Sequence, residues 1–270
     1  MNSDFYFAMG KSHMVCQDYA YAGVNSKGNQ VAVVSDGCSA SPDTDFGSRY
    51  LVRSAVICGS GIVDLRAPKD AFLFDQDNAN KFISNTIGFA SQSGVAFHLS
   101  PYHLDATLFY LEVKENFVCI ASAGDGVIFA KTVDGELKIW DIEYPSGCPF
   151  YPSYLLNEKR LGEYSDGCGM EKVLTFSTIG DDEKKQINKT TTPFFTLNLP
   201  KEKYEFVGIA SDGILTFDMP FEQAIMQLTA FKNYTGSFVK RRVRRFLKEC
   251  HSNNTLPTDD ISMGVVYLGG

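Results

Sequence analysis

The sequence has few of the residues that build disulfide frameworks, zinc sites or nucleic-acid interfaces. Seven cysteines are scattered over 270 residues without a Cys-x-x-Cys pair, and only four histidines are present. This spacing is typical of free thiols in a reducing compartment and argues against a disulfide framework or a zinc site. Lys and Arg total 25 against 32 Asp and Glu, which gives a net charge of −7. That balance argues against a nucleic-acid partner, because such binding depends on clustered cations.

Long apolar runs are also absent. No stretch approaches the roughly 20 apolar residues needed to span a bilayer, so we expect no membrane-embedded segment. The N-terminal residues, MNSDFYFAMGKSHMVCQDYA, mix acidic, polar and aromatic side chains and do not follow the pattern of a signal peptide. We therefore expect a cytoplasmic protein. Nothing in the sequence reports on the oligomeric state, and a monomer is the working expectation.

The apolar pattern predicts strands and helices within a single domain. Apolar runs bounded by turn residues predict strands at 5–9, 19–24, 30–36, 106–113, 117–124, 126–133, 137–142 and 259–269. Helical spacing predicts helices at about 45–61, 69–97, 220–231 and 236–250. The four runs between 106 and 142 are expected to form one antiparallel meander. Helices between widely separated strands favour a layered α+β domain over residues 1–270, with the helices outside the sheets.

Residues 143–200 are the least regular part of the sequence. Proline, glycine and tyrosine are dense in EYPSGCPFYPSYLL, and GDDEKKQINKTTTP has the character of an exposed loop. We expect irregular excursions around two strands, near 172–178 and 194–199.

Three segments repeat one pattern, in which a short apolar run leads to an aspartate beside a glycine. They are VAVVSDG at 31–37, IASAGDG at 120–126 and VGIASDG at 207–213. Each alone is most simply a β-turn. Together, aspartates at neighbouring strand ends can face one point, where they would repel each other unless a cation lay between them. Oxygen ligands without histidine or cysteine favour Mg²⁺ or Mn²⁺, and a pair of such ions hydrolyses phosphate esters.

With three further segments, this ordered set resembles the protein phosphatase 2C family of metal-dependent serine/threonine phosphatases, as a divergent bacterial-type member. CQDYA resembles the family's first acidic motif, VAVVSDGCSA its "DG" motif, DATLFYLEV its "G-S-T" strand, SAGDGVIFA its "GDS" hairpin, IASDGILTF its "SDG" motif and DDISMGVV its closing "DN-x-S". The resemblance spans nearly the whole chain. It implies a four-layer α-β-β-α sandwich, in which two antiparallel sheets pack face to face between outer helices, with metals at one edge.

The resemblance also implies a set of metal ligands. Asp36 would bridge two Mn²⁺ or Mg²⁺ ions, and the carbonyl of Gly37 would help to hold one of them. Asp212 and Asp259 would complete the ligands of the other ion. Asp125 would contribute, beside Asp212, to a third and weaker site.

The implied activity is hydrolysis of phosphoserine and phosphothreonine in proteins by a metal-activated water. Asp18 would orient that water, and the phosphorylated substrate would be the target of a serine/threonine kinase. His13 stands where the family usually has a phosphate-gripping arginine. It is either a structural histidine or a weaker phosphate contact or proton donor. Gln17 stands where many relatives have a metal-binding glutamate.

These departures leave two alternatives open. His13, Gln17 and the absence of an "R-x-L-G-D" segment within 143–200 are also consistent with a weakened relative that binds a phosphorylated partner without turnover. The altered 143–200 region also motivates a phosphohydrolase acting on a small molecule as an alternative. The basic stretch KRRVRRFLK, residues 240–248, is interpreted as a solvated helix face, with docking to an acidic or phosphorylated partner as the minority interpretation.

Overall fold

The strand-forming runs build two antiparallel sheets. The structure is a computed structural model, and it describes residues 1–59, 74–179 and 181–269. The first sheet is seven-stranded and contains, in spatial order, β1 (Asn2–Ala8), β12 (Ile261–Tyr267), β11 (Tyr204–Ala210), β6 (Gly126–Thr132), β7 (Leu137–Glu143), β8 (Lys172–Thr178) and β9 (Asp181–Thr190). The second is five-stranded and contains β10 (Phe195–Pro200), β5 (Phe117–Ala123), β4 (Leu108–Val113), β3 (Gln30–Ser35) and β2 (Tyr19–Val24).

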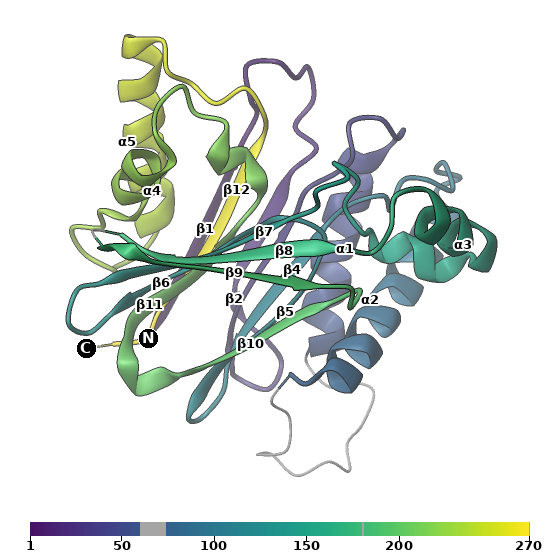
Figure 1. Cartoon of the computed structure of the whole chain (residues 1–270), viewed down its shortest axis with the longest axis horizontal. Helices are drawn as coiled ribbons and strands as arrows, with labels where there is room; N and C mark the ends of the chain where they lie inside the picture. The colour runs from purple at the N-terminus through teal and green to yellow at the C-terminus, as the bar shows by residue number, and fades with distance from the viewer. Residues whose placement is uncertain (60–73, 180, 270) are drawn as a thin grey trace.

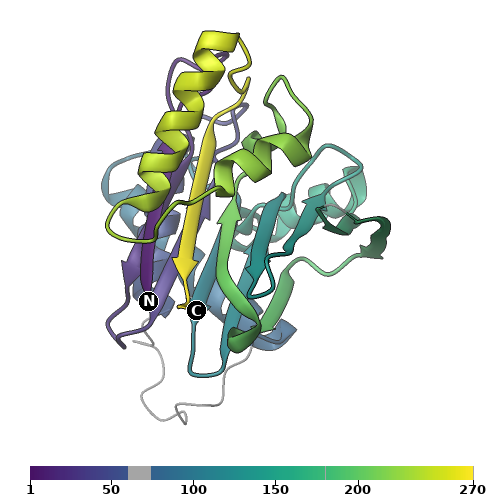
Figure 2. The ribbon, with the colours of Figure 1, turned by 90° about the vertical axis from the view of Figure 1, so that its left-hand side faces the viewer.

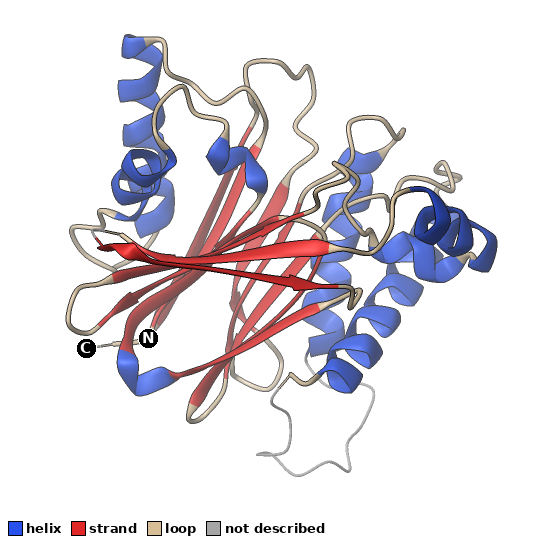
Figure 3. Ribbon diagram, viewed as in Figure 1, coloured by secondary structure: helices blue, strands red, loops and turns tan. Residues whose placement is uncertain are grey.

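Helices cover the outer face of each sheet (Figures 1 and 3). The five-stranded sheet carries α1 (Thr44–Gly59) and α2 (Gln76–Ala96), and the seven-stranded sheet carries α4 (Phe221–Thr229) and α5 (Phe238–Asn253). Shorter elements complete the chain: η1 (Pro152–Leu156), α3 (Glu158–Gly167), η2 (Lys201–Lys203) and η3 (Asp212–Leu215). Among the helices that the structure describes, none combines the length and apolar character of a bilayer span.

Three apolar clusters fill the spaces between these layers. One lies between the two sheets and includes Phe109, Ile128 and Val207, each with no exposed surface. The other two lie between each sheet and its helices. Apolar side chains on both faces explain why β3, β4 and β5 read as continuous apolar runs rather than as alternating patterns. The expected four-layer α-β-β-α sandwich is therefore confirmed.

The single meander expected between 106 and 142 is wrong. β4 pairs with β5, and β6 pairs with β7, but the two hairpins belong to different sheets. The chain crosses between the sheets at Gly124 (φ 91°) and Gly126 (φ 143°), where a β-carbon would be strained. The turn between β5 and β6 therefore lies at an edge shared by both sheets.

Two expectations for 143–200 also need correction. The segment expected to be a loop at 180–193 contains β9, which pairs with β8 at the edge of the seven-stranded sheet. Its lysines and polar residues are typical of edge strands, which use charge to avoid pairing with other chains.

The helix α3 was not expected, although Asn157 caps it by accepting a hydrogen bond from the backbone nitrogen of Arg160 (3.2 Å). Residues 69–73 of the helix expected at 69–97 lie outside the described residues.

Candidate functional site

Strand register brings the first two aspartates together. β2 and β3 pair antiparallel with Tyr19 opposite Ser35, so the next positions outward, Asp18 and Asp36, face each other at the sheet edge. The backbone at Asp36 is fixed by Thr107, whose hydroxyl accepts from the Asp36 nitrogen (3.0 Å) and whose nitrogen donates to the Asp36 carbonyl (2.8 Å). Gly37 forms a β-bridge with Ala106.

The seven-stranded sheet supplies a second pair in the same way. β11 pairs with β6 with Ala210 opposite Val127, so extending the register by two residues places Asp212 beside Asp125. Asp125 lies in the crossover turn between the sheets, and Asp212 begins η3. Gly213 is required here, because a β-carbon would lie 1.7 Å from the carbonyl oxygen of Asp260.

The two pairs meet across the sheets. The carboxyl group of Asp36 contacts those of Asp18 and Asp212. Burial, followed by these two neighbours, raises the pKa of Asp36 well above its usual range. Burial also raises the pKa of Asp18 and of Asp125, each to about 7, and raises that of Asp212. Asp18 is fully buried, whereas the other three remain partly accessible to solvent. The four residues form an acid cluster that opens at one edge of the sandwich.

The acid cluster has few hydrogen-bond donors. The hydroxyl of Ser211 donates to Asp18 Oδ2 (2.6 Å), while Asp18 Oδ1 and Asp212 Oδ1 are buried without a hydrogen-bond partner. Within the described residues, none of the four forms an ion pair with lysine or arginine. Crowded carboxylates with unsatisfied oxygens and no basic partner are the donor set that hard divalent cations satisfy.

The acid cluster is nevertheless not arranged around a single point. In the part of the chain that the structure describes, no three His, Cys, Asp or Glu side chains surround a position for a metal ion. The carboxyl groups meet in pairs instead, with Asp36 between Asp18 and Asp212. The residues therefore fit Mn²⁺ or Mg²⁺ because they are carboxylates and because they lie close together. To hold an ion, their side chains must rotate toward it.

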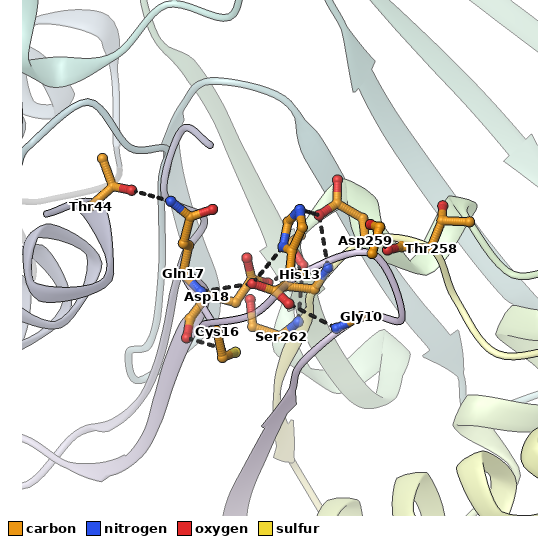
Figure 4. Close-up of polar contacts among 12 residues, drawn as sticks. Gly10, His13, Cys16, Gln17, Asp18, Thr44, Thr258, Asp259 and Ser262 are labelled. Carbon is orange, nitrogen blue, oxygen red and sulfur yellow. Dashed lines mark hydrogen bonds and ion pairs between the residues drawn. The ribbon is translucent and has the colours of Figure 1, made fainter. Parts of the chain in front are cut away.

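Asp259 reaches the same edge from the bend before β12 and contacts His13 (Figure 4). His13 Nε2 lies 3.4 Å from Asp259 Oδ1, and His13 Nδ1 lies 3.0 Å from Oδ2 of the buried Asp260. The contact with Asp260 is the main cause of the raised pKa of His13. Asp259 also raises the pKa of Asp125 and of Asp212 electrostatically, which places it near the acid cluster.

Asp260 fixes the loop that carries His13. Its Oδ1 accepts from the nitrogen of Gly10 (2.8 Å), and its Oδ2 accepts from the nitrogen of Gln17 (2.7 Å). Gly10 packs so closely that a β-carbon would lie 2.2 Å from the backbone of Asp259. The side chain of Gln17 turns toward α1 and donates to Thr44 Oγ1 (2.7 Å).

Asp260 and Ser211 were not among the residues expected from the sequence, because a buried aspartate and a serine near a turn are individually unremarkable.

A third residue that sequence reasoning missed comes from the 143–200 region. Tyr151 lies beside Cys38, and Asp125 and Asp36 are near enough to act on it electrostatically. Burial is the main cause of the raised pKa of its hydroxyl. The tyrosine-rich segment around it therefore forms part of the wall of the site. The density of tyrosine in the sequence was a signal for such a wall, but it gave no means of choosing the residue.

An ion pair between a partly exposed arginine and a buried aspartate holds this segment in place. Arg160 of α3 lies 3.0 and 2.9 Å from the two carboxylate oxygens of Asp105, which also accept from Ser153 (2.6 Å) and Ser41 (2.9 Å). The carbonyl of Asp105 accepts from the nitrogen of Cys38 (2.8 Å). The segment 143–167 is thus tied to the backbone that follows Asp36.

Comparison with solved structures shows the same fold. The chain is similar to a bacterial serine phosphatase (13% identity, TM-score 0.62, covering 100% of this chain and 98% of that one). It is similar to the serine/threonine phosphatase Stp1 from Staphylococcus aureus (15% identity, TM-score 0.57, covering 100% and 96%). It is also similar to the Mycobacterium tuberculosis serine/threonine phosphatase PstP/Ppp (12% identity, TM-score 0.55, covering 99% and 98%). No curated protein matches the sequence.

A family model covers the part of the chain that holds the first four of the six motifs. The model described as protein phosphatase 2C matches residues 9–144, about half of the chain. That segment contains Asp18, Asp36 and Asp125, together with all of β2 to β7. The chain belongs to the protein phosphatase 2C family.

Proposed function

We propose that the protein hydrolyses phosphoserine and phosphothreonine in protein substrates, in opposition to a serine/threonine kinase, and that it requires Mn²⁺ or Mg²⁺. The observation that supports this most is the position of Asp36. Its carboxyl group touches Asp18 of its own sheet and Asp212 of the other, and within the described residues none of the three forms an ion pair with lysine or arginine. Such a cluster is costly unless cations occupy it.

Each residue has a distinct task in this proposal. Asp36, Asp212, Asp259 and the Gly37 carbonyl would hold two ions, and Asp125 would hold a third beside Asp212. A bound divalent cation supplies a Lewis acid that polarises the phosphoryl group and acidifies water.

The residues around these ligands act on the water and the substrate. Asp18, held by Ser211 (2.6 Å), would orient the attacking water by accepting a hydrogen bond from it. Tyr151, which lies beside Cys38, would limit which side chains approach the acid cluster. The expected contact of His13 with phosphate stays a prediction. Because His13 contacts both Asp259 and Asp260, we propose that it helps to position the carboxylate of Asp259.

The test is hydrolysis of a phosphopeptide, with a small aryl phosphate assayed in parallel. We expect turnover with Mn²⁺ or Mg²⁺, none with chelator, and at least a thousandfold loss of kcat in Asp36→Asn. If the wild-type protein is no more active than Asp36→Asn at saturating Mn²⁺, the proposal that the protein is an enzyme is wrong. Turnover of the aryl phosphate or of nucleotides, without turnover of phosphopeptides, would point to a small-molecule phosphohydrolase.

One observation favours a second candidate, a phosphoprotein-binding relative without turnover. His13 is engaged by Asp259 and Asp260, and Gln17 is engaged by Thr44, so neither side chain is free to take the place of the family's arginine or glutamate. Phosphopeptide binding that requires Mn²⁺, together with the absence of hydrolysis, would identify this function.

A further inference from the structure

A basic hollow lies between α4 and α5, away from the acid cluster. Four cations line this cavity of about 110 Å³: Lys232, Arg241, Arg242 and Arg245. The aromatic rings of Phe231 and Phe238 complete its wall, and no carboxylate lines it. We call it the α5 pocket. In a chain with a net charge of −7, a concave site lined by four cations is unusual.

Two of the four cations of the α5 pocket are held in place by neutral groups. Arg241 Nη2 donates to Asn233 Oδ1 (2.9 Å) and to the carbonyl of Thr235 (2.7 Å). Arg242 donates to the side-chain oxygen of Gln227 (2.8 Å) and to its carbonyl. These acceptors orient the guanidinium groups without cancelling their charge. The pocket is therefore organised and remains positive.

Carboxylates near the α5 pocket do not neutralise it. Asp4 accepts from the backbone nitrogen of Lys240 (3.0 Å) and acts on Arg241 only at longer range, and Glu249 acts on Arg242 in the same way. Among the described residues, none of the pocket's four cations has a carboxylate oxygen within ion-pair distance. Burial, and to a smaller extent Arg245, lowers the pKa of Arg242, and the opposing effect of Glu249 does not reverse this shift.

The α5 pocket and the acid cluster lie at opposite ends of β12. The chain between α4 and α5 is fixed at the far end, where Asn2 Nδ2 donates to the carbonyl of Tyr234 (2.6 Å) and Tyr234 stacks on Tyr267. Asp259 and Asp260 precede the other end, at Ile261. Seven strand residues span about 20 Å. Figure 2 shows α5 beginning near the end of β12 and running back along it. The pocket is therefore separate from the acid cluster.

We propose that the α5 pocket binds a phosphorylated side chain within an acidic segment of a partner protein. Forked guanidinium donors match phosphate oxygens, and clustered arginines recognise phosphorylated peptides. The cavity is of a size to admit one tetrahedral anion. A membrane surface or a nucleic acid carries extended negative charge, which the rest of this acidic molecule would repel. A single peptide segment is small enough to contact the pocket alone and avoids that repulsion.

Binding of a fluorescent phosphopeptide to the full chain, followed by polarisation in excess chelator, tests this proposal. Chelator stops hydrolysis and leaves the acid cluster negative, so phosphate is repelled there and binding reports on the α5 pocket whether or not the protein is a phosphatase. We expect binding about tenfold tighter than that of the unphosphorylated acidic peptide, and weaker at high salt. We expect inorganic phosphate to compete, and vesicles containing phosphatidylserine not to bind.

Matched variants locate the site. Arg245→Gln and Lys232→Gln each remove one exposed lining charge, and we expect about tenfold weaker binding from each. Arg244→Gln removes the same charge from the same helix outside the lining, and we expect a change of less than about twofold. Equal losses in Arg244→Gln and Arg245→Gln, equal binding of the unphosphorylated peptide, or binding of vesicles but not peptide would each overturn the proposal.

Discussion

His13 and Asp260 differ from the family pattern at two positions that touch each other. The pattern has arginine and asparagine there, whereas this chain has an imidazole 3.0 Å from a carboxylate. The carboxylate also accepts two backbone N–H groups, from Gly10 and Gln17. An asparagine has a single acceptor oxygen and could not serve all three donors. We interpret the two changes as one exchange that keeps the loop 10–17 fixed beside the acid cluster.

A double-mutant cycle tests this pairing. We expect His13→Gln and Asp260→Asn each to lower the free energy of unfolding by about 1–3 kcal/mol, because each leaves a buried polar partner unsatisfied. The double variant should lose less than the sum, with a coupling of about 1 kcal/mol or more in urea unfolding. His251→Gln, at the exposed end of α5, serves as the control and should change stability by about 0.5 kcal/mol at most. Strict additivity would show that the pair is not coupled.

Lys172 gives the protein a stability that depends on pH. It is 1% exposed, and burial lowers the pKa of its ammonium group to about 7. Between that value and the ordinary lysine pKa, the unfolded chain binds more protons than the folded one, so stability rises with pH. We expect wild type to gain about 1 kcal/mol per pH unit between pH 7.5 and 9.5 relative to Lys172→Met, measured by urea unfolding. Parallel pH profiles of the two proteins would contradict this.

At the scale of elements, α3 and η1 depend on one ion pair for their position. Arg160 is the residue of α3 that reaches the Asp105 carboxylate, which also accepts from Ser153 of η1. We expect Arg160→Gln to lower the free energy of unfolding by about 2–3 kcal/mol, because it leaves a buried carboxylate without its cation. KM for phosphopeptides should rise as well, since the segment carrying Tyr151 loosens. Lys159→Gln breaks an exposed pair on the same helix and should have little effect on either quantity. Equal behaviour of the two variants would contradict the account.

The strand ends were predictable from the sequence, whereas the contacts between them were not. Asp36 and Asp212 follow continuous apolar runs, and antiparallel pairing fixes which residues face each other at a sheet edge. The pairing of His13 with Asp260 depends on segments almost 250 residues apart, and no local pattern reports it. The wrong assignment of β9 has a similar cause, because a polar edge strand resembles a loop until its partner strand is known.

At the scale of the whole molecule, the acid cluster joins the two sheets. Asp18 and Asp36 extend the five-stranded sheet, and Asp125 and Asp212 extend the seven-stranded one. Without cations, crowded carboxylates oppose the packing of one sheet on the other. A cation held from both sides would favour that packing. Ion binding and folding are therefore expected to be coupled through the interface between the sheets.

Thermal unfolding measures this coupling independently of activity. We expect Mn²⁺ at about one hundred times its Kd to stabilise wild type by about 2.7 kcal/mol, which corresponds to a rise in Tm of about 5–10 °C. Asp36→Asn should lose most of this rise, yet should be more stable than wild type in chelator, because it removes a crowded charge. Asp134→Asn removes an exposed acid from the turn after β6 and should retain the full rise. A similar rise in Asp36→Asn would mean that the ions bind elsewhere, and that the acid cluster is tolerated in the fold without them.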